Sequence, residues 1–217
     1  MTDQTAPTIS LIGSSTVTTA LSGTYSDAGA TATDAVDGNL TSSIQTTSTV
    51  NTSAVGSYTV KYNVSDAAGN AATEVTRTVN VTDQTIPVIS LIGSSTVTVA
   101  HGSTYSDAGA TATDNLDGNL TSSIQTSSNV NTNAVGSYSV TYNVSDAAGN
   151  AATEVVRTVN VTDQTIPTIS LVGSSTVTAA LGATYTDAGA TATDAVDGNL
   201  TSSIQTSSNV NTNCLLY

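Results

Sequence analysis

Three features of the amino-acid sequence predict an all-β protein built from tandem β-sandwich repeats. The chain repeats itself with a period of about 80 residues, short stretches alternate between apolar and polar residues, and glycines separate these stretches. A period of that length indicates copies of one small domain. Alternation with a period of two indicates strands that are buried on one face only, and no stretch shows an apolar stripe at helical spacing.

The repeat is most visible in a tripeptide that opens each copy. It occurs as Asp3-Gln4-Thr5, Asp83-Gln84-Thr85 and Asp163-Gln164-Thr165. Residues 3–82 and 83–162 differ at about 14 positions. We therefore predict three domains, namely a first repeat over residues 1–82, a second over 83–162 and an incomplete third over 163–217.

The first half of a repeat contains four predicted strands. Residues 7–12 form an edge strand, because Pro7 lacks the backbone N–H that a central strand needs. Val17 lies in a short second strand. Residues 28–33 and 44–50 supply two more, with glycines at turn spacing between them.

The second half contains a β-hairpin with the clearest pattern of the chain. Residues 57–64 alternate strictly, a turn follows at residues 66–70, and a second alternating run covers residues 75–81. Arg77 falls on the apolar side of that run, and we interpret it as a strand-end residue that reaches out to an acid. Six or seven short strands in such a length indicate a two-sheet sandwich of the immunoglobulin type. The alternative, a disordered Ser/Thr-rich stalk, needs neither alternation nor glycines in register.

Several motifs resemble a known group of domains. They are Ile-Pro-Val-Ile-Ser-Leu-Ile-Gly from Ile86, Tyr-Ser-Asp-Ala-Gly-Ala from Tyr105, Asp-Asn-Leu-Asp-Gly from Asp114, Val-Gly-Ser-Tyr from Val135 and Asp-Ala-Ala-Gly-Asn from Asp146. Together they resemble the bacterial immunoglobulin-like repeats related to hyalin repeats, which occur in large secreted adhesins and as accessory domains of insecticidal crystal proteins. The resemblance implies tandem immunoglobulin-like β-sandwich repeats. The resemblance is less specific for function. Such repeats act mostly as spacers, and some hold calcium.

The charge of the chain restricts its partners. The net charge is −13, and Lys61, Arg77 and Arg157 are the only basic residues besides one histidine. Nucleic acid is excluded as a partner, because no basic patch can replace the counterions of phosphates. Membrane insertion is not expected, since no apolar run approaches about 20 residues. Met1 leads directly into the first repeat, so an export signal would have to lie outside this sequence.

The acidic residues suggest a calcium site. Of 16 acids 14 are Asp, a residue typical of turns. In an immunoglobulin topology the loops with Asp114, Asp117 and Asp146 lie beside Asp83, and Asp27 lies at the far end of the preceding repeat. We expect these five acids to converge on the junction of two repeats, where calcium would relieve their repulsion. The alternative is that they serve only as turn formers.

The full candidate set consists of these positions and their counterparts in the other copies. It comprises Asp3, Asp27, Asp34, Asp37, Asp66, Asp83, Asp107, Asp114, Asp117, Asp146, Asp163, Asp194 and Asp197.

No pattern of catalytic residues repeats. His101 is the only histidine, and its counterparts are Leu21 and Leu181. Cys214 is the only cysteine and has no histidine nearby in the sequence. Trp and Phe are absent, so the chain offers few aromatic side chains on which the sugar rings of a glycosidase substrate could stack. We therefore expect no enzyme activity.

The function that these features favour is a structural spacer in a secreted or cell-surface bacterial protein, with calcium stiffening the junctions between neighbouring repeats. One alternative is a module that binds glycans or a host surface through its loops. Another is an ice-binding surface formed by threonine-rich runs such as residues 46–52. Near identity of the copies favours the spacer, because a recognition surface is usually confined to one distinct domain.

The third copy departs from the repeat after Asn213 and lacks counterparts of residues 138–144 and 155–161, the two best-patterned strands of the second copy. A sandwich without that hairpin exposes apolar side chains and strand edges. We expect residues 163–217 to fold poorly alone, or to be completed by a hairpin from another copy of the chain through strand exchange.

Overall fold

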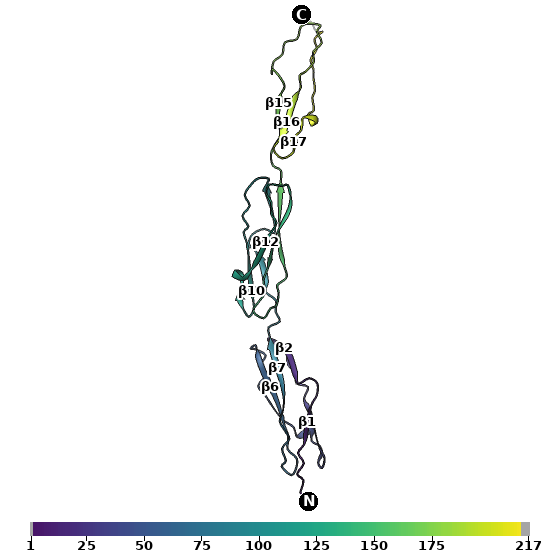
Figure 1. Ribbon diagram of the computed structural model, residues 1–217, viewed down its shortest axis with the longest axis vertical. Helices are drawn as coiled ribbons and strands as arrows, with labels where there is room; N and C mark the ends of the chain where they lie inside the picture. The colour runs from purple at the N-terminus through teal and green to yellow at the C-terminus, as the bar shows by residue number, and fades with distance from the viewer. Residues whose placement is uncertain (1, 214–217) are drawn as a thin grey trace. The chain divides into compact units, whose positions relative to one another are not determined.

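The computed structural model describes residues 2–213, and it confirms the all-β prediction (Figure 1). Within residues 2–213 the regular structure consists of strands and three short 3₁₀ turns. Over the described residues no helix has the length and apolar character that crossing a membrane requires. Cys214 and the departure from the repeat pattern that begins there lie outside the described residues.

The first repeat contains seven strands arranged in two sheets. They are β1 (Thr8–Leu11), β2 (Thr16–Ala20), β3 (Ala30–Asp34), β4 (Gly38–Asn39), β5 (Gln45–Ser48), β6 (Gly56–Asn63) and β7 (Val75–Thr82), with the 3₁₀ turn η1 (Thr41–Ser43) before β5. One sheet has the order β1-β3-β4 and the other the order β2-β7-β6-β5.

Most of these strands follow from the sequence pattern. β1 is an edge strand, as Pro7 predicts, and β6 pairs antiparallel with β7 from Gly56 opposite Val81 to Tyr62 opposite Val75. The two-residue strand β4 and the 3₁₀ turn were not predicted. β2 pairs in parallel with β7, a pairing of distant segments that local alternation cannot reveal.

The core of the first repeat lies between its two sheets. Alternation along β6 and β7 buries Val60, Tyr62 and Val79 on one side, and Ile9 and Ala32 are buried from the other sheet. Since the core contains small aliphatic side chains and one buried tyrosine, the apolar area that it removes from water is modest for a domain of this size.

The second repeat has the same elements in the same order. They are β8 (Val88–Leu91), β9 (Thr96–Ala100), β10 (Ala110–Asp114), β11 (Gly118–Asn119), η2 (Thr121–Ser123), β12 (Gln125–Ser128), β13 (Gly136–Asn143) and β14 (Val155–Thr162). Its sheets have the orders β11-β10-β8 and β12-β13-β14-β9, which repeat those of the first copy strand for strand.

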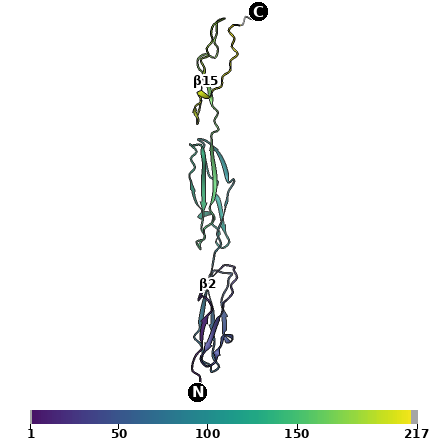
Figure 2. The same cartoon turned by 90° about the vertical axis from the view of Figure 1, so that its right-hand side faces the viewer.

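The described part of the third repeat contains one sheet. The rest of that part forms no strand and is drawn mostly as a plain tube in Figure 2. The sheet is formed by β15 (Thr168–Leu171), β16 (Ala190–Asp194) and β17 (Gly198–Asn199), followed by η3 (Thr201–Ser203). Its pairing matches that of β1, β3 and β4. However, Ile169 is 63% exposed, whereas its counterpart Ile9 is 8% exposed. The sheet is therefore formed, but its apolar face is open to solvent.

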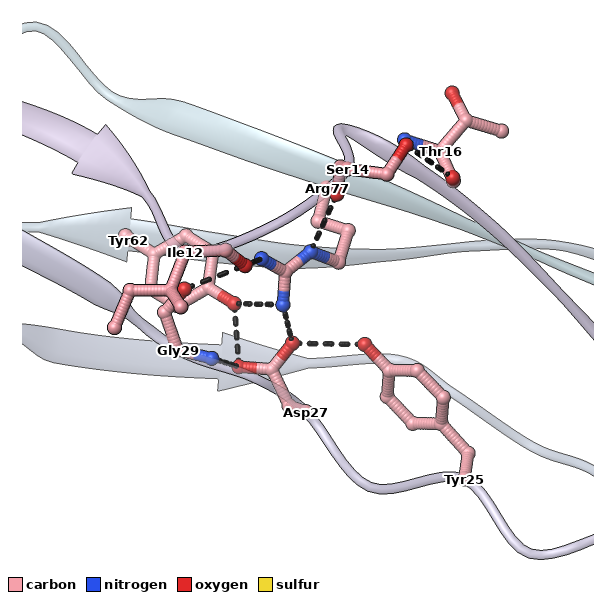
Figure 3. Close-up of polar contacts among 8 residues, drawn as sticks. All are labelled: Ile12, Ser14, Thr16, Tyr25, Asp27, Gly29, Tyr62 and Arg77. Atoms are coloured by element: carbon pink, nitrogen blue, oxygen red, sulfur yellow. Dashed lines mark hydrogen bonds and ion pairs between the residues drawn. The ribbon is translucent and has the colours of Figure 1, made fainter.

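The interior of each complete repeat contains an arginine, which corrects our interpretation of Arg77 as a strand-end residue. Arg77 lies within β7, points to the same side as Val79 and Val81, and is 1% exposed. It does bind an acid as predicted, since its Nη1 donates to Asp27, but the ion pair lies at the edge of the core instead of on the surface (Figure 3).

Nη1 of Arg77 also donates to the hydroxyl of Tyr62 at 3.2 Å, and the other two guanidinium nitrogens bind backbone oxygens. Nε donates to the carbonyl of Ser14 at 3.0 Å, and Nη2 donates to the carbonyls of Ile12 at 2.5 Å and Gly29 at 3.2 Å (Figure 3). These three carbonyls follow β1 or precede β3. The side chain therefore joins β7 to the opposite sheet, and the five donors of a guanidinium suit it to this role.

The carboxylate of Asp27 is the main acceptor in the hydrogen-bond network that surrounds Arg77. Its carboxylate accepts hydrogen bonds from the hydroxyls of Tyr25 and Tyr62 and from the N–H of Gly29, in addition to Arg77. The second repeat contains the same set of partners, namely Arg157, Asp107, Tyr105, Tyr142 and Gly109. The network is therefore a property of the repeat and not of one copy.

The network predicts how stability depends on pH. Burial raises the pKa of Asp107, but hydrogen bonds from Tyr142, Tyr105 and Arg157 outweigh burial and hold it below the ordinary value of 3.8. Burial and the bond to Asp107 raise the pKa of Tyr142 above its ordinary value of 10.0. A carboxyl group whose pKa is lowered by folding stabilises the fold above pH 3.8, and this stabilisation is lost as the pH falls through the folded pKa. A tyrosine whose pKa is raised by folding stabilises the fold below pH 10.0, and this stabilisation is lost as the pH rises towards the folded pKa.

We therefore expect a plateau of stability from about pH 4 to pH 10, with losses on both sides. Urea unfolding midpoints at a series of pH values measure it, and tyrosinate absorbance reports the alkaline limb. If Tyr62 and Tyr142 titrate in the native protein with the pKa of free tyrosine, the predicted alkaline loss is wrong.

Candidate metal centre

Nine of the predicted aspartates form three equivalent clusters, one in each repeat. In every cluster the three residues offer carboxylate oxygens that all lie within 4.8 Å of one another. The clusters are Asp3, Asp34 and Asp37, then Asp83, Asp114 and Asp117, then Asp163, Asp194 and Asp197. Each cluster is formed within a single repeat, whereas the sequence led us to expect that acids of two neighbouring repeats would meet.

A tight turn places the second and third acids of each cluster. Asp114 ends β10, and its Oδ1 accepts hydrogen bonds from the backbone N–H groups of Leu116 at 2.8 Å and Asp117 at 3.1 Å. The chain then passes through Gly118 with φ +72°, a conformation that residues with a Cβ rarely adopt. The Asp-x-x-Asp-Gly motif therefore folds locally into a turn that brings two carboxylates together.

The first acid is held by its own tripeptide and by a distant turn. Asp83 Oδ1 accepts hydrogen bonds from the N–H and the hydroxyl of Thr85, at 3.0 and 2.5 Å. Asn150 Nδ2 donates to the backbone carbonyl of Asp83 at 3.3 Å, and the N–H of Ala147 donates to Asp117 Oδ2 at 2.7 Å. The turn between β13 and β14 therefore positions two of the three acids.

The second cluster contains buried oxygens that have no partner. Asp83 is 6% exposed. Among the described residues, no group hydrogen-bonds to Oδ2 of Asp83 or Oδ2 of Asp114, and both atoms are shielded from solvent. The same holds for Oδ2 of Asp3 in the first cluster. A buried carboxylate oxygen without a partner costs free energy, and neighbouring carboxylates repel one another.

No basic side chain of the protein relieves this repulsion. Lys61 Nζ pairs with Glu74 at 2.9 Å, and the two arginines pair with Asp27 and Asp107. These three residues are all the lysines and arginines of the chain. The lysines and arginines of the chain therefore leave the three clusters without a paired positive charge.

The donors of the clusters suit calcium better than magnesium. In each cluster three carboxylate oxygens lie within 4.8 Å of one another. Magnesium demands near-ideal octahedral geometry and usually keeps several waters, whereas calcium accepts six to eight oxygens at flexible angles. Backbone carbonyls and water can therefore complete the shell of a calcium ion.

Four of the predicted ligands have other roles. The carboxylates of Asp27 and Asp107 bind the arginine network, so the expectation that Asp27 joins a junction cluster is corrected. Asp66 and Asp146 act as turn formers. Asp146 accepts hydrogen bonds from the N–H and Nδ2 of Asn150, both at 2.7 Å, and thereby fixes the amide that holds Asp83.

Sequence reasoning missed the supporting residues of the site. Thr85 binds Asp83 and has counterparts in Thr5 and Thr165, which bind Asp3 and Asp163 in the same way. The repeated Asp-Gln-Thr tripeptide was the available signal, because a threonine two residues after an aspartate can close a local turn.

Comparison with known proteins confirms the resemblance to bacterial immunoglobulin-like repeats. The family model of the Ig-like domain of bacterial surface proteins matches residues 9–81, 89–161 and 169–215. An uncharacterized 81.3 kDa protein of Acholeplasma phage L2 is 34% identical over 182 residues, which are 79% of this chain. The chain spans 24% of the length of that relative.

Some solved structures share local similarity. A lipoprotein from Bacteroides thetaiotaomicron is 24% identical with a TM-score of 0.32, over 39% of this chain and 45% of the other. Two structures of ZmpB from Clostridium perfringens also match. The one with the CBM51-2 domain in complex with GlcNAc is 28% identical with a TM-score of 0.30, over 41% and 21% of the two chains. The one with the M60 catalytic domain is 17% identical with a TM-score of 0.38, over 78% and 33%.

Proposed function

The chain belongs to the Ig-like domain family of bacterial surface proteins, and from this premise we propose that it is a non-catalytic spacer whose repeats bind calcium at their aspartate clusters. Its place is at the cell surface or in a secreted protein. The observation that carries the proposal is the repetition of the site. The three-carboxylate cluster returns in all three copies, and the arginine network returns in both complete ones.

Repetition favours a mechanical role over recognition. When each copy carries the same internal supports, the benefit accumulates along the chain, because the stability of an array depends on every member. A ligand-binding surface needs only one specialised copy. The differences between the first two repeats are few and consist mostly of exchanges between small residues.

The position of the cluster suggests what calcium would do. Asp83 directly follows β7 (Val75–Thr82), the last strand of the first repeat. An ion shared by Asp83, Asp114 and Asp117 would fix this segment to the turn after β10. Since the segment connects two repeats, fixing it would remove conformational freedom from the connection and stiffen the array.

We expect calcium to stabilise the protein and magnesium to do so less. At a calcium concentration 100 times the Kd, the free energy of unfolding should rise by about 2.7 kcal/mol. For a domain of this size that corresponds to an increase in Tm of roughly 10 °C or more. Calorimetry of the full chain in chelator, in millimolar calcium and in millimolar magnesium measures the effect.

A pair of variants separates the site from general charge effects. Asp114→Asn combined with Asp117→Asn should abolish the response of the second repeat, because Asn keeps the turn geometry but removes both charges. Glu154→Gln removes charge from an exposed acid that bonds to Asn143, and it should leave the response intact. Superimposable melting curves in chelator and in calcium for the unmodified chain would refute calcium binding.

Binding of a glycan or a host surface is the competing function. A glycan array probed with the full chain distinguishes the two, since a spacer should show no reproducible binding to any one class of sugar. Reproducible binding to one class would overturn the spacer proposal and leave the calcium sites as a separate property.

A further inference from the structure

In each complete repeat a strand near the start of the repeat lies beside the last strand and runs in the same direction. In the first repeat β2 pairs in parallel with β7, from Thr16 opposite Thr78 to Ala20 opposite Thr82 (Figure 1). In the second repeat β9 pairs with β14 in the same register. We propose that this parallel pair is a mechanical clamp, which lets each complete repeat bear tension along the chain. The inference goes beyond the proposed spacer, which needs length and not strength, and it does not depend on calcium.

The direction of the two strands decides how tension acts on them. The chain enters β2 at Thr16 and leaves β7 at Thr82. Because the strands are parallel, these two points lie at opposite ends of the ladder of backbone hydrogen bonds. Tension along the chain therefore pulls the strands past each other and loads all bonds of the ladder at once. In an antiparallel pair the same tension would open the ladder from one end, one bond at a time.

The ladder extends over the whole of the shorter strand. In the second repeat the N–H of Thr158 donates to the carbonyl of Ser95 at 2.8 Å, just before β9 begins. The N–H of His101 donates to the carbonyl of Thr162 at 2.9 Å, just after β9 ends. The first repeat has the two equivalent bonds, at 2.9 and 2.8 Å. Both complete repeats therefore offer the same set of bonds to a shearing force.

The buried arginine holds the segment through which tension reaches the ladder. Arg157 lies within β14, and it donates from Nε to the carbonyl of Ser94 at 3.0 Å and from Nη2 to the carbonyl of Ile92 at 2.5 Å. Both acceptors lie between β8 and β9. Since this segment connects the two strands, tension cannot slide β9 along β14 without also pulling the segment off the guanidinium. Hydrogen bonds from a charged donor are stronger than neutral ones, so the arginine shares the load with the ladder.

The third repeat has no such pair within the described residues. Residues 176–180, the counterparts of β2, form no strand, and the sheet of this repeat contains β15, β16 and β17. When the chain of residues 1–217 is stretched from its two ends, we expect two unfolding events at high force, each of which releases about 80 residues. The third repeat should extend at low force.

The direct test applies force to the second repeat in two directions by single-molecule force spectroscopy. Gln84 precedes β8, Gln164 follows β14, and both are exposed. Handles attached through Gln84→Cys and Gln164→Cys therefore load the ladder in shear. Ser103 is exposed and follows β9, so handles attached through Ser103→Cys and Gln164→Cys pull on two neighbouring strand ends and open the ladder from one end. Both full-length variants carry Cys214→Ser, so that only the introduced thiols react.

We expect the second repeat to unfold at a several-fold higher force in shear than when the ladder is opened from one end. The same native repeat is loaded in both experiments, so the difference reports the direction of the force and not the free energy of unfolding. Both are carried out in chelator, which keeps calcium out of the comparison. Equal unfolding forces in the two directions would overturn the clamp and leave the proposed spacer function intact.

A pair of proline variants tests the bonds of the ladder. In a parallel ladder alternate residues of a strand bond to the neighbouring strand, so the pattern set by Ser95 and His101 includes Val99 and leaves out Thr98. β9 is an edge strand, where proline is tolerated if its nitrogen faces away from the sheet. In the shear direction Val99→Pro should lower the unfolding force several-fold, whereas Thr98→Pro should change it little.

Equal shear forces for the two proline variants would show that the ladder does not carry the load, and the clamp would be refuted. If Val99→Pro prevents folding, the comparison of the two directions in the chain without proline decides the question by itself. Calcium binding is measured separately by calorimetry, so its failure would leave the clamp standing.

Discussion

Replacing Arg157 with methionine should lower the free energy of unfolding of the second repeat by about 3–5 kcal/mol, the range for breaking a buried ion pair by removing one partner. Arg157 is 1% exposed and donates to Asp107, Tyr142 and the backbone carbonyls of Ser94, Ile92 and Gly109. The substitution removes the charged partner of Asp107 and the guanidinium donors that bind the three carbonyls. Methionine fills a similar length, so lost volume contributes little.

The first repeat provides an internal control for this measurement. Its network around Arg77 is unchanged in the variant, so calorimetry should show one transition near the original Tm and one well below it. Arg157→Lys should recover little stability, because an ammonium group keeps the charge but cannot reach the carbonyls of Ile92 and Gly109 with a planar fork. A loss below about 1 kcal/mol, the level of exposed ion pairs, would contradict a structural role for the network.

In the polypeptide of residues 1–217, backbone amides from Ile169 to Ile204 should exchange with solvent about 100-fold or more faster than those from Ile89 to Ile124. Both segments contain the same three-stranded sheet, but its apolar face is covered only in the second repeat. Ile169 and Leu171 are each 63% exposed, whereas Ile89 is 8% exposed. Sheets with few buried contacts open at low free energy, and their amides exchange early. Hydrogen exchange followed by NMR or mass spectrometry on a monomeric sample gives the comparison.

A longer polypeptide supplies the control. When residues 134–162 are repeated after Asn213, the third repeat gains counterparts of β13 and β14 together with an arginine opposite Asp187, and protection should rise to that of the second repeat. Equal protection of the two segments in monomeric residues 1–217 would contradict the prediction. Protection that appears only in a dimer would instead support strand exchange between copies.

The sequence predicted the elements that depend on local pattern. Alternation over residues 57–64 and 75–81 predicted the β6–β7 hairpin, and Pro7 predicted an edge strand. These succeed because a strand buried on one face must alternate. The Asp-x-x-Asp-Gly turn was also predictable as a turn, since it closes through bonds between residues two and three positions apart.

The sequence alone determined that this protein consists of repeated β-sandwich domains with clustered aspartates, because period and alternation are properties of neighbouring residues. Only the tertiary structure decided which aspartates share a site. Asp27 and Arg77 are 50 residues apart, and Asp83 and Asn150 are 67 apart. Whether a carboxylate meets an arginine, an amide or no partner depends on how distant strands are paired, and identical Asp residues in similar turns therefore have different roles.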